Sequence, residues 1–223
     1  IFNATGASLI MAGCSIRENT AQGRRRYDED YSLYYADEAH GGGICNFGDL
    51  RVDRCEISNN TAKSLDPGTY PPSDRAYAHG GGIYCDNAAP FEITNCTISG
   101  NIANGAQGSY GGGINAGASL VLKLCTVACN EAQGSSTKRG GGIYSYAAAG
   151  QEPEFYNSLI ANNSGAAGAD GQDLFGRFES SDFNVLGTAD GYTLIGWTDN
   201  NVVGQDPKIG SLRFNGGPTR THA

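Results

Sequence analysis

Seven cysteines are the most reactive side chains of this 223-residue sequence. No two of them have the Cys-x-x-Cys spacing of a zinc ribbon or a redox motif, so we expect no metal site built from thiolates. Four cysteines recur at one position of a repeated pattern: Cys14, Cys55, Cys96 and Cys125. We expect these four to form a buried column of free thiols, which fill space as small apolar groups. Disulfides are the alternative, either along this column or between Cys45 or Cys85 and a neighbour.

Two long segments, 23–40 and 63–79, are rich in tyrosine and arginine, the side chains that dominate recognition surfaces. Together they predict a binding or assembly surface made of Tyr27, Tyr31, Tyr34, Tyr35, Tyr70, Tyr77, Arg24, Arg25 and Arg26. The alternative is that the two segments pack on each other and shield one side of the fold. Each segment returns as Ala-His before a glycine triplet, and we expect His40 and His79 to stack at a turn rather than to catalyse a reaction.

Carboxylates are the remaining candidates, because cleavage of a polysaccharide needs an acidic cluster, often with calcium, or a well-placed base. The candidates in the first half of the chain are Asp28, Asp30, Asp37, Asp49, Asp53 and Asp86. Asp170, Asp173, Asp182 and Asp190 could bind calcium, but their spacing matches neither an EF-hand nor an RTX repeat. Arg51 and Arg54 are expected to face solvent. The sequence therefore predicts no catalytic residues, no metal site and no cofactor.

An internal repeat must position these residues. Four Gly-Gly-Gly-Ile blocks begin at Gly41, Gly80, Gly111 and Gly140. A second pattern, apolar-x-apolar-x-x-Cys-x-apolar-x-x-Asn, begins at Leu9, Leu50, Phe91 and Leu120. A degraded fifth copy runs from Asn157, at the Cys position, to Asn162. Apolar residues alternate within each half, as in a β-strand, and the odd gap from Val52 to Cys55 indicates a bend between two strands.

One such repeat cannot bury its own apolar face, but stacked repeats can, at about 4.8 Å per coil. The predicted fold is all-β: a right-handed, single-stranded parallel β-helix of about five to seven coils, with long loop inserts at one corner. Coils and inserts should occupy residues 1–165, and a less regular C-terminal part or cap residues 166–223. Besides the cysteines, we expect inward columns of Ile44, Ile83, Ile114 and Ile143, of Met11, Val52, Ile93 and Leu122, and of Asn19, Asn60, Asn101, Asn130 and Asn162.

Composition excludes two classes of function. Fifteen basic against 23 acidic residues give a net charge of −8, which is unsuited to binding nucleic acid. No apolar run approaches the roughly 18 residues that a membrane-spanning helix needs.

The C-terminal region adds a resemblance. Asp170-Gly171-Gln172-Asp173-Leu174, Asn184-Val185-Leu186-Gly187 and the string from Asn215 to Ala223 resemble bacterial right-handed β-helix proteins of the choice-of-anchor Q domain-containing type. The Gly-Gly-Gly-Ile and Ile-x-x-Asn corners are also similar to the passenger repeats of polymorphic outer-membrane autotransporters. The resemblance implies a protein that is secreted and displayed outside the cell or on its surface, and it does not imply an enzyme.

These observations favour a non-catalytic extracellular β-solenoid with a structural or adhesive role. Because the ends of a solenoid expose unpaired strand edges, end-to-end self-association into a surface fibre is one predicted form. The alternative is a β-helix that binds surface polysaccharide, or cleaves it as a lyase does, with its tyrosine-rich insert face.

Overall fold

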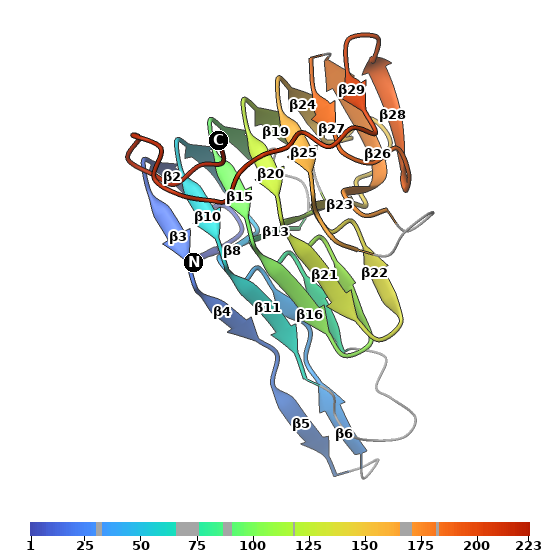
Figure 1. The fold of residues 1–223 in the computed structure, drawn as a ribbon. Helices are drawn as coiled ribbons and strands as arrows, with labels where there is room; N and C mark the ends of the chain where they lie inside the picture. Colours follow the sequence, from blue (N-terminus) through green and yellow to red (C-terminus); the bar gives the residue numbers. More distant parts are fainter. Residues whose placement is uncertain (30–32, 66–75, 87–90, 118, 166–170, 182) are drawn as a thin grey trace.

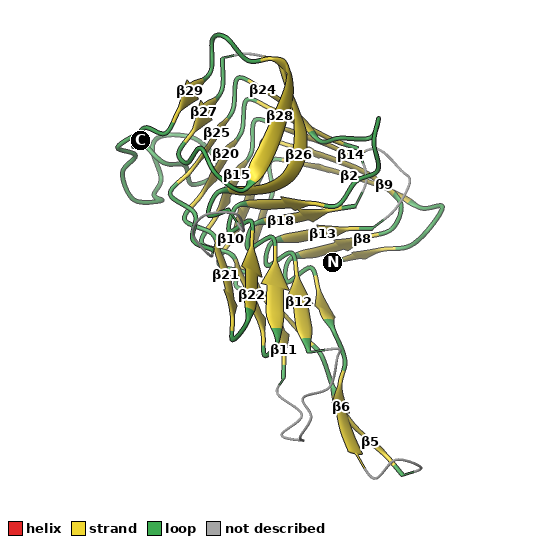
Figure 2. Cartoon of the chain, turned by 90° about the vertical axis from the view of Figure 1, so that its right-hand side faces the viewer, coloured by secondary structure: helices red, strands yellow, loops and turns green. Residues whose placement is uncertain are grey.

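The computed structural model describes residues 1–29, 33–65, 76–86, 91–117, 119–165, 171–181 and 183–223 as β-strands and connecting turns (Figures 1 and 2). Successive coils hydrogen-bond through parallel strands in constant register, and an antiparallel hairpin extends from one side. Within these residues there is no helix with the length and apolar character to cross a membrane.

A full coil passes through five parallel sheets, which are numbered along the chain from the strand at Ser8–Ala12. Sheet 1 contains β2 (Ser8–Ala12), β9 (Asp49–Asp53), β14 (Phe91–Thr94), β19 (Leu120–Lys123), β24 (Glu154–Tyr156), β26 (Leu174–Ser181) and β28 (Tyr192–Trp197). Sheet 2 contains β3 (Ser15–Arg17), β10 (Glu56–Ser58), β15 (Thr97–Ser99), β20 (Thr126–Ala128), β25 (Leu159–Ala161), β27 (Val185–Leu186) and β29 (Val202–Val203). Sheet 5 contains β1 (Phe2–Asn3), β8 (Ile44–Asn46), β13 (Ile83–Cys85), β18 (Ile114–Ala116) and β23 (Ile143–Ser145), and β26 joins it to sheet 1.

Sheets 3 and 4 form a flat arm that projects from the body of the solenoid (Figure 2). Sheet 3 contains β4 (Thr20–Gln22), β11 (Thr61–Ser64), β16 (Ile102–Gly105) and β21 (Glu131–Gly134). Sheet 4 contains β7 (Ala39–His40), β12 (Tyr77–His79), β17 (Gly108–Tyr110) and β22 (Thr137–Arg139). Their facing sides bury a small cluster of alanines, Ala39, Ala62, Ala78 and Ala103. Because alanine is so small, the two sheets of the arm lie close together and leave no room for a wider core.

The bend that the sequence pattern indicates is a single residue in the left-handed backbone conformation. Between sheets 1 and 2 this residue is Arg54, Asn95, Leu124 or Asn157, with φ of 50°, 53°, 53° and 46°. Between sheets 2 and 3 the equivalent set begins with Glu18 (φ 59°) and continues with Asn59 (φ 54°) in the next coil. One such residue turns the chain and shifts the inward side-chain phase by one position, which accounts for the odd gap between Val52 and Cys55.

The glycine triplets form the corner between sheets 4 and 5, and their positions require glycine for different reasons. Gly111 has φ of +70°, where a Cβ is disfavoured. At Gly112 a Cβ would lie 2.4 Å from both the Gly141 carbonyl oxygen and the Glu131 carbonyl carbon. The second glycine therefore permits a close approach to the neighbouring coil and to the arm.

Aliphatic columns fill the interior. On sheet 5, Ile44, Ile83, Ile114 and Ile143 pair in register and are fully buried. On sheet 1, Met11, Val52, Ile93 and Leu122 pair in the same way, and Phe155 continues this column. The wide body of the solenoid thus has a continuous apolar core along its axis.

Hydrogen-bonding columns occupy the two corners of sheet 2. At the first, the backbone N–H of each cysteine faces the Sγ of the next, at 3.3 Å for Cys14 to Cys55, Cys55 to Cys96 and Cys96 to Cys125. Ser158 Oγ accepts the N–H of Cys125 at 3.2 Å, so a serine takes the cysteine position in the next coil. All seven cysteines are free thiols, including Cys45 and Cys85.

Asparagines form the column at the second corner, where each side-chain amide donates to the next. The Nδ2 to Oδ1 distances are 2.9 Å for Asn19 to Asn60, 2.9 Å for Asn60 to Asn101 and 2.8 Å for Asn101 to Asn130. The prediction that Asn162 is the fifth member is wrong: Asn130 donates to Asn163 at 2.9 Å. Asn162 is the left-handed corner residue, with φ of 60°. The fifth copy is therefore shifted by one residue, with Ser158 rather than Asn157 at the cysteine position.

The C-terminal segment runs back along sheet 2 toward the N-terminal coils (Figure 1). Its Arg220 Nε donates to Glu56 Oε1 at 2.8 Å, and its backbone N–H donates to Glu56 Oε2 at 3.1 Å. His222 Nε2 lies 2.9 Å from Ser99 Oγ. The segment thus bridges coils that are far from it in sequence.

Candidate functional site

The first predicted recognition segment forms an antiparallel hairpin of β5 (Arg25–Asp28) and β6 (Leu33–Ala36) that extends the arm (Figure 1). Tyr27 pairs with Tyr34 and Arg26 with Tyr35 across this hairpin. The Tyr27 ring is exposed, and Arg24 just before the hairpin is exposed as well. Tyr31 and Tyr70 lie outside the described residues, so the predicted surface is placed only in part. Tyr77 lies apart from the hairpin, on β12 of the arm.

A groove runs along the junction of sheets 4 and 5, where the arm meets the body. It has a volume of about 580 Å³. Its lining is mostly aromatic and comprises Glu38, His40, Tyr77, His79, Tyr84, Asp86, Tyr110, Tyr144 and Tyr146. Of these, only Tyr77 belongs to the surface predicted from the inserts.

Two outward columns build the groove. The residue before each glycine triplet forms the first: His40 stacks on His79 with ring centroids 5.0 Å apart, and His79 stacks on Tyr110 at 5.1 Å. The residue after each Gly-Gly-Gly-Ile forms the second, which includes Tyr84 and Tyr144. Alternation along the strand explains this second column, because the isoleucine points inward and the next residue must point outward.

The columns touch each other across the glycine corner. Tyr110 lies 4.9 Å from Tyr144, and His40 lies 4.4 Å from Tyr84, between ring centroids. Tyr144 stacks on Phe175 of the next coil at 5.4 Å with the rings 13° from parallel. The aromatic surface therefore continues across successive coils along the axis.

Polar groups line the groove between the rings. The Tyr146 hydroxyl donates to Asp86 Oδ1 at 3.0 Å. Burial raises the pKa of the Tyr110, Tyr144 and Tyr146 phenols, so these hydroxyls stay protonated at neutral pH. The groove thus combines apolar ring faces with neutral hydroxyls and with the carboxylates of Asp86 and Glu38.

One end of the groove holds Glu38 beside the two stacked histidines. Glu38 Oε2 lies 3.2 Å from His40 Nε2 and 3.8 Å from His79 Nε2. The pKa of His79 is lowered to about 3, mainly by burial and to a smaller extent by the neighbouring His40. Burial also lowers the pKa of His40, against the opposing effect of Glu38 and Asp86. Both rings are therefore neutral at neutral pH. Within the described residues, Glu38, His40 and His79 form the group of side chains that could hold a metal.

A second hollow of about 600 Å³ adjoins the groove and shares Tyr146 with it. Phe175, Arg177 and Tyr192 are among the residues that line it. Arg139 lies over the Phe175 ring at 4.7 Å from its centroid. Groove and hollow together extend the aromatic surface from β7 of the arm to β28 near the other end of the solenoid.

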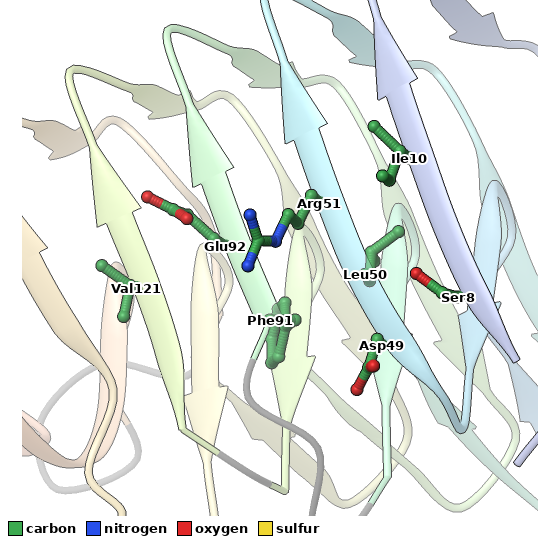
Figure 3. Close-up of a pocket in the computed structure, with 8 residues that line it drawn as sticks. All are labelled: Ser8, Ile10, Asp49, Leu50, Arg51, Phe91, Glu92 and Val121. Carbon is green, nitrogen blue, oxygen red and sulfur yellow. The ribbon is translucent and has the colours of Figure 1, made fainter. Parts of the chain in front are cut away.

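A further hollow, of about 390 Å³, lies on the outer face of sheet 1 (Figure 3). Figure 3 shows Ile10, Arg51, Glu92 and Val121 on four successive strands, with the Arg51 guanidinium extended toward the strand that carries Glu92. Lys123 forms an ion pair with Glu92 at 3.1 Å. This face therefore has a mixed row of charged and aliphatic side chains, in which Asp49 and Glu92 are the carboxylates that line the hollow.

The predicted carboxylate candidates lie at separate places. Asp53 pairs with the exposed Arg54 at 2.7 Å, and these two form a local contact at a corner of sheet 1. Asp173 accepts from Asn163 Nδ2 at 2.8 Å and so ends the asparagine column, and burial raises the pKa of this carboxyl. Asp30, Asp170 and Asp182 lie outside the described residues. In the described part, the three-ligand cluster is Glu38, His40 and His79, rather than any set of these aspartates.

Comparison with known proteins agrees with this architecture. The family model described as a right-handed β-helix region matches residues 1–176, so the chain belongs to the right-handed β-helix family. The predicted fold class is thereby confirmed, including its handedness. No curated protein and no solved structure matches the chain significantly. The fold is compatible with adhesive, structural and polysaccharide-binding roles.

The sequence contained a signal for the groove that the prediction from the inserts did not use. The residues flanking the glycine blocks are aromatic in several coils: His40, His79 and Tyr110 before them, Tyr84 and Tyr144 after them. Because each block recurs once per coil, flanking residues must form columns on the outside of the corner.

Proposed function

We propose that this chain is an adhesive, non-catalytic β-solenoid that binds a neutral polysaccharide along the aromatic groove. The observation that supports the proposal most directly is the continuity of the aromatic surface: the groove and the second hollow share Tyr146 and follow the axis over successive coils. An extended ligand of repeating units suits a surface of repeating coils better than a compact ligand does.

The chemistry of the groove suits sugars. The apolar face of a sugar ring packs on an aromatic ring, and successive coils offer rings at about 4.8 Å, comparable with the length of one sugar unit. Around the rings, phenol hydroxyls and the carboxylates of Asp86 and Glu38 can exchange hydrogen bonds with sugar hydroxyls. A ligand site in a protein usually has a few polar groups among many apolar ones.

Charge favours a neutral polysaccharide over an acidic one. Glu38 and Asp86 line the groove, and the whole chain has a net charge of −8. A polysaccharide of uronic acids would bring further carboxylates next to these two, and the repulsion in a half-buried groove would oppose binding.

We also propose that the protein is of the choice-of-anchor Q type and acts outside the cell, secreted or at the cell surface. The strings from Asp170 to Leu174 and from Asn215 to Ala223 support this finer assignment. A surface location would place the groove among extracellular polysaccharides. End-to-end association into a fibre stays a prediction, which sedimentation and electron microscopy of the purified chain would test.

Affinity electrophoresis tests the binding proposal. The chain would be run through gels that contain a soluble β-glucan, mannan or galactan, with polygalacturonate as the acidic comparison. We expect retardation by at least one neutral polysaccharide and at least a roughly tenfold weaker affinity in Tyr146→Ala and Tyr77→Ala, a difference of about 1.4 kcal/mol.

Tyr27→Ala is the matched control, because Tyr27 is an exposed tyrosine of the hairpin outside the groove. If Tyr27→Ala abolished binding and Tyr146→Ala did not, the insert face rather than the groove would be the site. Release of unsaturated oligosaccharides from any of these polymers would identify a lyase and overturn the non-catalytic part of the proposal.

A further inference from the structure

We propose that Glu38, His40 and His79 form a binding site for a divalent transition-metal ion of the zinc type at one end of the groove. The proposal rests on these three side chains and their surroundings and is independent of polysaccharide binding. The repeat predicts that His40 and His79 stack, but Glu38 is one carboxylate among many, and the spacing of residues does not indicate that it meets both rings.

The three ligand atoms already converge. One nitrogen of each imidazole and a Glu38 carboxylate oxygen lie within 4.8 Å of one another, and Glu38 Oε2 lies 3.2 Å and 3.8 Å from the two Nε2 atoms. The parallel pairing of β7 with β12 sets this geometry, because it places His79 beside His40 in register. The rings stack 20° from parallel, so both Nε2 atoms point to the same side, where Glu38 lies. Small rotations of the three side chains would bring the atoms to the roughly 2.0–2.2 Å at which zinc binds nitrogen and oxygen.

His79 carries a second, independent indication of a ligand. Its Nε2 is buried without a hydrogen-bond partner among the described atoms. Buried polar nitrogen is costly when unsatisfied, and in proteins such groups normally have a partner. A metal ion at the position between His79 and Glu38 would provide that partner.

Asn115 is placed to orient His79 from the other side of the ring. The Asn115 side-chain amide lies 3.2 Å from His79 Nδ1, and the Asn115 Oδ1 atom is itself buried without a partner. A half-turn of this amide would direct Oδ1 to an Nδ1–H, which is the usual support of a histidine that binds metal through Nε2. The turn would exchange the hydrogen bond that Asn115 Nδ2 donates to the Tyr110 carbonyl oxygen, at 3.2 Å, for one that Oδ1 accepts from His79 Nδ1–H.

The donor set indicates the class of ion. Two imidazoles and one carboxylate are typical zinc ligands, whereas calcium and magnesium prefer sites made of oxygen. Three protein ligands leave a fourth position, which faces the groove near Tyr84 and Asp86. Water would occupy that position in the absence of another ligand.

Calorimetric titration with zinc chloride, and titration with Co²⁺ followed by its visible absorption, test the site. The titrations would use a Cys129→Ser background, which removes the exposed thiol as a competing ligand. We expect one ion per chain. Losing an outer-sphere partner of a metal typically lowers affinity roughly 10- to 100-fold, so we expect His79→Gln, which removes a ligand, to lower it by at least that much. Glu38→Gln should weaken binding too, and because Glu38 is exposed this variant should keep the fold.

His222→Gln is the matched control, since His222 is the third histidine of the chain and contacts Ser99 in the C-terminal segment. It should bind zinc as the parent does. Imidazole NMR signals of His40 and His79, and not those of His222, should shift on addition of Zn²⁺. Absence of a one-to-one complex, or equal affinity of the parent and the Glu38→Gln and His79→Gln variants with native circular dichroism, would overturn the proposal.

Discussion

The ion pair between Arg220 and Glu56 ties the C-terminal segment to the second coil, and replacing Arg220 by alanine tests what that tie contributes. Glu56 is 1% exposed, although it is a carboxylate. The Arg220 guanidinium and backbone N–H both donate to it, and Ser58 Oγ donates to it at 2.5 Å. In Arg220→Ala the Glu56 carboxylate keeps Ser58 but loses its opposite charge.

The loss in the free energy of unfolding depends on whether the Glu56 carboxylate stays buried after Arg220 is replaced. Removing one partner of a buried ion pair costs about 3–5 kcal/mol when the remaining charge stays buried. Here the C-terminal segment can leave sheet 2 and admit water to Glu56, which limits the loss. We therefore expect Arg220→Ala to lower the free energy of unfolding by about 3 kcal/mol, which for a chain of this size lowers Tm by roughly 6–12 °C.

The stabilisation by the Arg220–Glu56 ion pair should be larger at neutral pH than at acidic pH. Burial opposes ionisation of Glu56, but hydrogen bonds from Arg220 and Ser58 outweigh it, so the pKa of this carboxyl is lowered in the folded chain. A lowered pKa contributes stability above the unfolded value, about 4.3 for Glu, and that contribution is lost as the pH falls through the folded pKa. The difference in Tm between the parent and Arg220→Ala should therefore be full at pH 7 and shrink below about pH 4.

Thermal and urea unfolding of a double-mutant cycle provide the assay. Glu56→Gln, Arg220→Ala and the double variant would be compared at pH 7, with Arg213→Ala as the control, since Arg213 is exposed in the same segment. We expect a coupling energy near 2 kcal/mol between Arg220 and Glu56. Additive effects within about 0.5 kcal/mol, or an equal loss in Arg213→Ala, would refute the reasoning.

Three further outcomes follow from the coil contacts. Gly112→Ala should destabilise the fold by about 3 kcal/mol or more in urea unfolding, because its Cβ would lie 2.4 Å from backbone atoms. Gly217→Ala is the control and should be nearly neutral, because its Cβ would meet only the Thr219 carbonyl oxygen, at 3.8 Å. Asn101→Ala should cost about 3 kcal/mol, because it leaves the buried Asn60 backbone N–H without its acceptor and leaves Asn60 Nδ2 with the Ile16 carbonyl oxygen alone. Asn19→Ala at the exposed end of the same column should cost less, and equal losses would contradict a role for burial. In the folded chain a thiol reagent should modify Cys129 first, since it is exposed, and mass spectrometry of the digested product would show whether another cysteine reacts earlier.

The sequence alone predicts the inward columns because their signal is repeated. Four coils present the same residue types at Cys55, Ile57 and Asn60, and the stacking of coils turns sequence equivalence into contact. In the fifth copy the signal is ambiguous, since Asn162 and Asn163 are both asparagine and two aliphatic residues precede them. A shift of one residue exchanges the inward and outward sides of a strand, and only packing against the neighbouring coil decides which residue enters the column.

The candidate site depends on contacts between different parts of a coil, and periodicity predicts these poorly. Tyrosines in the inserts are numerous, so composition favoured the inserts as the recognition surface. The structure instead gathers Tyr84, Tyr110 and Tyr144 at the corner between the arm and the body. The path of the chain through sheets 3 and 4 creates that corner, and nothing in the spacing of the glycine blocks gives the angle between the two parts.

The amino-acid sequence is sufficient to predict a stack of parallel coils, because repeated residue types must lie above one another when the coils share a register. The repeat also indicates where the turns lie, although the left-handed residue itself varies: Asn95 tolerates that backbone well, whereas Arg54 and Leu124 take the same position in other coils. The folded structure was needed to show that the coil is a wide body with a thin alanine-filled arm, that Glu38 meets His40 and His79, and that Arg220 reaches Glu56. The stacking of His40 on His79 follows from their equal place before a glycine triplet. The other contacts join residues with no common spacing, and they are set by the three-dimensional path of the chain rather than by its repeat.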